Sequence, residues 1–227
     1  SGVYPPCSSQ WVVNGNVYRC AGDASVTLAN GDVITSNRPI TIAADKGFFL
    51  AANTQIGSNA NPIAVLSTYG NITSTGLTTI NGSLNGGTGN ITLASAVISG
   101  NVYTVGDIRI LGGTINGLVE SRDNTIVARD TTFLGGLKGH SGIRIQGGNI
   151  TGDITLTAAN PLELSGVVYT SGRVTGPNQI TVNNGSQLGS PTSLVQMTSQ
   201  AGPIIVDNSL IYGNLRTPDY TTVFVQN

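Results

Sequence analysis

The side chains that could do chemistry in this chain are concentrated in its middle. Ten of the 21 charged residues lie within 47 positions, and the single histidine, His140, lies among them. The ten are Asp107, Arg109, Glu120, Arg122, Asp123, Arg129, Asp130, Lys138, Arg144 and Asp153. Carboxylates can act as general acids and bases, and arginine and histidine can bind ligands. Catalysis and binding are therefore the two chemistries to weigh.

The residue pattern argues against catalysis. Polysaccharide lyases and glycoside hydrolases need paired carboxylates, or an aspartate with lysine or arginine, that converge in a groove. The chain has only 11 acidic residues, and the stretch between Gly47 and Gly106 carries no charge. No Gly-x-Ser-x-Gly elbow, HExxH motif or phosphate-binding loop occurs. We predict that the chain is not an enzyme and uses no cofactor.

Binding is the chemistry that remains, and four residues carry it. Arg109, Arg122, His140 and Arg144 form the candidate binding patch, for which a surface glycan or a receptor is the expected ligand. The alternative is that the charges of this region pair with one another across a solvated surface, where ion pairs contribute little stability. The sequence leaves both interpretations open.

The two cysteines, Cys7 and Cys20, are the other reactive groups. They could be free thiols, part of a metal site or a disulfide. A metal site is disfavoured, because His140 is the single histidine and no CxxC motif occurs. We predict a disulfide and no metal, and a disulfide favours a periplasmic or extracellular location.

A repeat must position these residues. Apolar residues open short strands at spacings of 17, 18, 17, 19, 18 and 24 residues, and a small or aliphatic residue follows two positions after each. The openers are Ile91, Ile108, Ile126, Ile143, Leu162, Ile180 and Ile204. Such alternation is typical of a strand that buries one face.

Two more apolar columns and a row of glycines keep a fixed phase to these openers. The second column is Ile98, Ile115, Phe133, Ile150, Tyr169, Leu188 and Ile211. The third column is Val102, Val119, Leu137, Ile154 and Leu215. The glycines are Gly100, Gly117, Gly135, Gly152, Gly189 and Gly213, and Ser171 interrupts the row.

Stacked rungs explain this fixed phase, whereas an antiparallel sandwich does not. We predict an all-β, single-stranded β-solenoid with rungs of about 18 residues, in which glycine occupies corners where a Cβ atom would clash. The inward positions do not recur every six residues as in left-handed hexapeptide helices, which favours right-handed coiling. In this register Glu120 falls next to Lys138, and Arg122 next to His140.

The N-terminal part follows the same plan less regularly. We predict that residues 1–24, which fit none of the columns, form a cap that contains the disulfide, and that 25–227 are one continuous solenoid. Val26, Ile40 and Ile63 each resemble strand openers. Ile72 either opens a rung or belongs to the second column.

Composition agrees with thin stacked layers. Aromatic residues make up 5% and charged residues 9% of the chain, and it contains 31 glycines. The net charge of −1 predicts no nucleic-acid partner, and the absence of 18 consecutive apolar residues predicts no membrane insertion. The chain opens on Ser1-Gly2 without a visible signal peptide, so we interpret it as a processed fragment.

Short phrases in the chain resemble two bacterial families. Gly106-Asp-Ile108, Ile150-Thr-Gly-Asp-Ile154 and Ile211-Tyr-Gly-Asn-Leu215 resemble the triangular rungs of bactofilins, which are polymer-forming scaffold proteins. The run from Trp11 to Cys20, with Asn61-Pro-Ile63 and Leu66-Ser-Thr-Tyr-Gly70, resembles the N-terminal region of MshQ-type proteins. Those are large secreted proteins linked to the mannose-sensitive haemagglutinin pilus, and this resemblance implies adhesion at the cell surface. Bactofilins are cytoplasmic and lack such a cap, so that resemblance implies fold alone.

These observations lead to one functional prediction and two alternatives. We predict an extracellular, monomeric adhesion or spacer module of a bacterial secreted or pilus-associated protein, which binds a surface glycan or other domains of the same adhesin. The first alternative is a structural scaffold that assembles end to end. The second is an ice-binding protein, which would need a regular outward row of threonines. The outward rows Thr92, Arg109, Val127, Arg144, Glu163, Thr181, Ile205 and Ser99, Asn116, Leu134, Thr151 are not regular.

Overall fold

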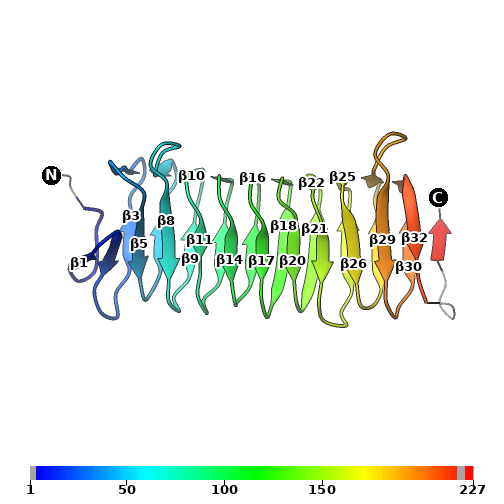
Figure 1. Ribbon diagram of the computed structural model, residues 1–227, viewed down its shortest axis with the longest axis horizontal. Coiled ribbons are helices and arrows are strands. Elements are labelled where there is room, and N and C mark those ends of the chain that lie inside the picture. The colour runs from blue at the N-terminus through cyan, green and yellow to red at the C-terminus, as the bar shows by residue number, and fades with distance from the viewer. Residues whose placement is uncertain (1–3, 219–222, 227) are drawn as a thin grey trace.

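The fold is a long β-solenoid. A computed structural model describes residues 4–218 and 223–226. These residues form 33 strands and no helix, wound into about ten turns. Figure 1 shows the resulting rod, with the chain ends at opposite tips and the successive turns side by side along its axis. The outermost residues of the predicted cap and solenoid, 1–3 and 227, lie outside the described residues.

Each turn contributes one strand to each of three sheets, which we number in chain order. Sheet 1 contains β1 (Trp11–Asn14), β2 (Val17–Cys20), β5 (Ile40–Ala44), β8 (Ile63–Ser67), β11 (Leu84–Asn85), β14 (Val102–Thr104), β17 (Val119–Ser121), β20 (Leu137–Gly139), β23 (Ile154–Leu156), β26 (Arg173–Gly176), β29 (Val195–Ser199) and β32 (Gly213–Arg216).

Sheet 2 contains β3 (Val26–Leu28), β6 (Phe48–Leu50), β9 (Ile72–Ser74), β12 (Ile91–Leu93), β15 (Ile108–Ile110), β18 (Thr125–Arg129), β21 (Gly142–Gln146), β24 (Leu162–Ser165), β27 (Ile180–Asn183), β30 (Ile204–Asp207) and β33 (Val223–Gln226). Sheet 3 contains β4 (Val33–Ile34), β7 (Thr54–Ile56), β10 (Thr78–Ile80), β13 (Ala96–Ile98), β16 (Gly113–Ile115), β19 (Thr131–Phe133), β22 (Asn149–Thr151), β25 (Val168–Ser171), β28 (Gln187–Leu188) and β31 (Leu210–Ile211).

The three predicted apolar columns are confirmed as the inner faces of the three sheets. The openers stack in sheet 2, where Ile91 pairs with Ile108 and the series continues in register to Ile204. The second column stacks in sheet 3 and the third in sheet 1. Nearly all of these side chains are fully buried. Each rung therefore buries its inward residues only against its neighbours, as the repeat pattern indicates.

The predicted rung length of about 18 residues agrees with the observed average of about 19. Val26, Ile40 and Ile63 each open a strand as predicted, although Val26 lies in sheet 2 whereas Ile40 and Ile63 lie in sheet 1. Ile72 pairs with Ile91 in sheet 2, so it opens a rung, which is the first of its two predicted alternatives. Six-residue corners at 57–62 and 189–194 lengthen their rungs, and they project from the rod in Figure 1.

The glycine row marks places where the backbones of successive rungs touch. A Cβ atom on Gly135 would lie 2.4 Å from the carbonyl carbon of Gly117, and one on Gly117 would lie 2.6 Å from that of Gly100. Real Cβ atoms do not approach backbone so closely, so the predicted clash at these corners is confirmed. The atoms that exclude the side chain belong to the neighbouring rung.

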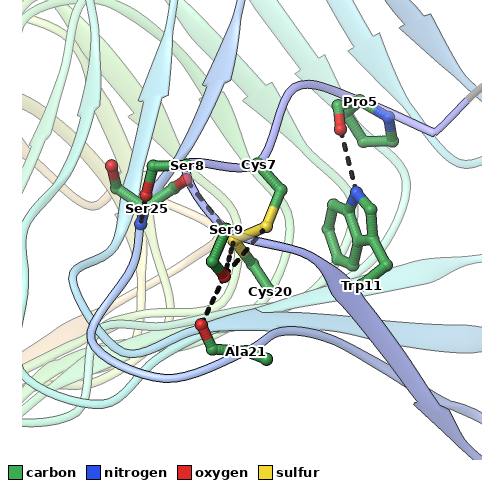
Figure 2. Close-up of a disulfide and its surroundings, with 8 residues drawn as sticks. All are labelled: Pro5, Cys7, Ser8, Ser9, Trp11, Cys20, Ala21 and Ser25. Atoms are coloured by element: carbon green, nitrogen blue, oxygen red, sulfur yellow. Dashed lines mark hydrogen bonds between the residues drawn. A yellow bond between two sulfur atoms is a disulfide. The ribbon is translucent and has the colours of Figure 1, made fainter.

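A disulfide-linked hairpin lies across the N-terminal end of the solenoid. Strand β1 is antiparallel to β2, and β2 pairs in parallel with β5 of the first rung. The predicted disulfide is present between Cys7 and Cys20, whose Cα atoms are 5.7 Å apart, and Cys7 forms a bridge with Val26. Figure 2 shows the disulfide with Trp11, whose Nε1 donates to the Pro5 carbonyl at 2.9 Å.

Candidate functional site

The outer face of sheet 2 carries two of the four predicted binding residues. Arg109, Val127, Arg144 and Glu163 follow one another in register on β15, β18, β21 and β24 and point outward. Arg144 Nε lies 3.5 Å from Glu163 Oε2, and the two side chains are 69% and 46% exposed. The predicted outward row of sheet 2 is thus confirmed, and it brings Arg109 and Arg144 onto one surface.

Two grooves lie on this face, and Val127, Arg144 and Glu163 border both. Groove 1 has a volume of about 360 Å³ and is lined mainly by polar and charged side chains: Arg109, Arg129, Arg144, Gln146, Glu163 and Asn183. Groove 2 has about 310 Å³ and extends toward Thr125, Ser141 and Asn160. Both volumes are at the small end of the range typical of ligand sites.

Arg122 and His140 lie apart from this row, at the corner between sheets 1 and 2. Arg122 follows β17 and makes two hydrogen bonds to the carboxylate of Asp123, each 3.2 Å long. His140 follows β20, and its Nδ1 lies 2.8 Å from Thr157 Oγ1. Because Ser141 of this corner also lines groove 2, the corner adjoins the sheet 2 face. The four predicted residues therefore form two neighbouring pairs.

The corner is an electrostatically coupled group. The hydrogen bond from Arg122 lowers the pKa of Asp123, and the positive charge of His140 lowers it further by a smaller amount. The same hydrogen bond raises the pKa of Arg122. Both side chains are more than half exposed, so solvent screens these interactions. The corner therefore favours the ionised form of Asp123.

The predicted neighbours across rungs are confirmed in one case and wrong in the other. Glu120 pairs with Lys138 in the sheet 1 register, although the four ion pairs of the described residues do not join them. His140 does not face Arg122, because its backbone amide bonds to the Asn124 carbonyl at 3.1 Å. The corner after β17 has three residues and that after β20 has two, which shifts the register.

The arrangement suits binding better than acid–base chemistry. Glu163 is the single carboxylate among the described residues that line the two grooves, whereas glycosidases use a pair. The described residues include no group of three or more His, Cys, Asp or Glu side chains placed to hold a metal ion. Arginine side chains offer several exposed donors, which can bind carboxylates, phosphates or hydroxyl groups.

The outer face of sheet 3 is a feature that the sequence reasoning missed. The ten strands of this sheet contain no charged residue. Their outward side chains stack directly, and the row reads Val33, Gln55, Thr79, Val97, Thr114, Thr132, Asn149, Val168, Gln187 and Leu210. From Val97 onward, each residue of this row directly precedes a residue of the second apolar column, as Val97 precedes Ile98. The outward row that the sequence predicted for this sheet consisted instead of the residues that directly follow that column, such as Ser99.

Among the described residues, no helix has the length and apolar character needed to span a membrane.

Comparisons with protein-family models, with curated protein sequences and with solved structures find no match to this chain. The resemblance to MshQ-type proteins and to bactofilins therefore stays a prediction.

Proposed function

We propose that the chain is a non-enzymatic module of a bacterial surface protein, which binds a surface ligand or holds a binding domain away from the cell. The rod shape is the observation that supports this proposal best. About ten rungs spaced by about 4.8 Å give a rod about 50 Å long, with the chain ends at opposite tips. Such a shape separates whatever is joined to its two ends.

The charged surface supports a binding role for the rod itself. We define the charged patch as Arg109 and Arg144, which line the grooves, together with Arg122 and His140 of the adjoining corner. Arg109 and Arg144 of sheet 2 expose donors beside the carboxylate of Glu163, which suits a glycan or a receptor with acidic groups. The disulfide supports an extracellular location, because disulfides persist in oxidising compartments.

Attachment of the module to its target cells tests the binding role. We expect alanine variants of Arg109, Arg122, His140 and Arg144 to lose attachment while their melting temperatures stay unchanged. The Arg173→Ala variant is the matched control, because Arg173 is an exposed arginine on β26 of sheet 1. Unchanged attachment in all four patch variants would show that the charged patch is not the binding site.

End-to-end assembly is the alternative that concerns the tips of the rod. The antiparallel hairpin at the N-terminal end supports a monomer, since a second copy could not continue the parallel ladder of sheet 1 through β1. Light scattering over a concentration series distinguishes a monomeric module from an end-to-end assembly. A constant mass supports the monomeric module, and growth into filaments would replace it by a scaffold.

Ice binding is a second candidate function, which the outer face of sheet 3 favours. Thr79, Val97, Thr114 and Thr132 occupy four consecutive rungs of an uncharged row. Their β-branched side chains have few rotamers, so they present a fixed surface to a lattice. This candidate predicts thermal hysteresis that Thr114→Lys abolishes and Thr92→Lys, on sheet 2, preserves. Absence of hysteresis in the unchanged protein would eliminate it.

A further inference from the structure

A cleft of about 420 Å³ lies at the N-terminal tip, between the hairpin and the first rung. Its lining contains three aromatic residues, Tyr4, Trp11 and Tyr18, and isoleucines of β4 and β5. Ser36, Asn37 and Arg38 of the loop between β4 and β5 complete it. We call this the aromatic cleft. The lining is part aromatic and aliphatic and part polar, and the volume lies within the range typical of small-ligand sites.

The three aromatic rings form one cluster. The ring of Tyr4 stacks on that of Trp11 with centroids 6.0 Å apart, and it lies 6.2 Å from the ring of Tyr18. Tyr4 is 54% exposed, so one of the rings is open to solvent. Clustered aromatic rings that remain accessible can pack against the apolar C–H face of a sugar ring.

The hairpin holds this cluster in place before any ligand binds. The indole Nε1 of Trp11 donates to the Pro5 carbonyl, which fixes the plane of the ring (Figure 2). The disulfide between Cys7 and Cys20 closes the segment that contains both Trp11 and Tyr18. Groups fixed in advance lose little conformational entropy on binding. The aromatic cleft is therefore preorganised.

Arg38 contributes a positive charge that is paired with no carboxylate of the described residues. Its Nε donates to Asn16 Oδ1 at 3.1 Å, and its Nη2 donates to Tyr18 Oη at 3.2 Å and to the Gly15 carbonyl at 3.4 Å. All three acceptors are uncharged, and Arg38 takes part in none of the ion pairs of the described residues. These bonds orient the guanidinium beside the aromatic rings, where an anionic group would complement it.

We propose that the aromatic cleft binds a saccharide residue that carries a carboxylate. The sugar ring packs against the exposed aromatic cluster, and Arg38 binds the carboxylate. Ser36 and Asn37 offer a hydroxyl and an amide to the sugar hydroxyls. This inference rests on the proposed role in surface binding, and it places an acidic glycan at the tip of the rod rather than on its side.

Tryptophan fluorescence tests the proposal directly, because Trp11 is the single tryptophan of the chain and lies in the aromatic cleft. The probes are sialyllactose and a galacturonic acid trimer, with lactose and a galactose trimer as their neutral counterparts. We expect a saturable change with at least one acidic probe and a much weaker response to its neutral counterpart. No saturable response to either acidic probe would overturn the proposal.

Variants separate the roles of the charge and of the rings. Arg38→Gln and Tyr4→Ala should each weaken binding of the acidic probe about tenfold. Arg173→Gln, which removes an exposed arginine far from the tip, should leave the affinity unchanged. Equal affinity for acidic and neutral probes, unaffected by Arg38→Gln, would refute carboxylate recognition. Melting temperatures of the variants show whether they remain folded.

Failure of this inference and failure of the proposed function give different results. If the titrations show no binding while variants of the charged patch still lose attachment, the surface-binding role stands and the aromatic cleft is not its site. If acidic sugars bind and the patch variants attach normally, the tip alone carries the binding.

Discussion

Replacing Gly135 by alanine should force two neighbouring rungs apart. The added Cβ atom would lie 2.4 Å from the carbonyl carbon of Gly117, 2.6 Å from its oxygen and 2.8 Å from the Asn116 oxygen. All three atoms belong to backbone, so no side chain can rotate to make room. Overpacking of this kind costs about 1–3 kcal/mol, and the backbone contact places Gly135→Ala at the upper end. Alanine also lowers the conformational entropy of the unfolded chain, and this effect stabilises the folded state by about 0.4–1 kcal/mol.

The net expectation is a loss of about 2 kcal/mol in the free energy of unfolding. For a chain of this size that loss corresponds to a melting temperature lower by about 4–8 °C. Gly142→Ala is the matched control, because its Cβ atom would meet nothing closer than 3.5 Å, at Thr125 Cγ2. We expect the control to be unchanged or slightly more stable. Equal melting temperatures of the two variants in circular dichroism would refute the assigned role of the glycine row.

Three further predictions concern other parts of the rod. Replacing Cys7 and Cys20 by alanine should cost about 3 kcal/mol. The lost amide protection in hydrogen exchange should be confined to the hairpin and first rung, because rungs contact only their neighbours; a uniform loss along the rod would contradict this. Arg144→Ala and Glu163→Ala should each change the unfolding free energy measured in urea by less than about 1 kcal/mol, because the pair is exposed; a larger loss would indicate a structural role. Tyr169→Phe removes a buried hydroxyl that donates to a backbone carbonyl at 2.7 Å and should cost about 1 kcal/mol. Burial raises the pKa of Tyr169, so the contribution of its neutral phenol is complete below the ordinary tyrosine pKa of about 10 and is lost as the pH rises above it. Urea unfolding at rising pH should therefore show a steeper alkaline loss in the unchanged protein than in Tyr169→Phe, and parallel curves would contradict the assignment.

The central rungs could be predicted from sequence because stacking ties residue type to position. Ile91, Ile108 and Ile126 recur at nearly constant spacing, since each must fall directly above the last to bury its side chain. The N-terminal register could not be predicted in the same way. Ile63 follows a strand of sheet 3 and therefore lies in sheet 1, although its apolar character alone resembles that of the openers in sheet 2.

The candidate sites were predictable to the extent that they lie on regular strands. Arg109 and Arg144 were predicted in one outward row, because alternation and rung spacing together fix their positions. Arg122 and His140 lie in corners, where a difference of one residue changes which groups meet. The aromatic cleft escaped prediction because Tyr4 and Arg38 belong to no column, and only the path of the chain across the first rung brings them together.

The direction of the backbone hydrogen bonds has a mechanical consequence for a rod that connects two partners. The three sheets bond each rung to the next along the long axis, so tension between the two tips pulls directly on those bonds. The rungs should then detach one at a time rather than all together. Each released rung of about 19 residues supplies about 60 Å of extended chain in exchange for one rung spacing. A rod of this construction would lengthen in steps under load, and the disulfide-closed hairpin would limit peeling at the N-terminal tip.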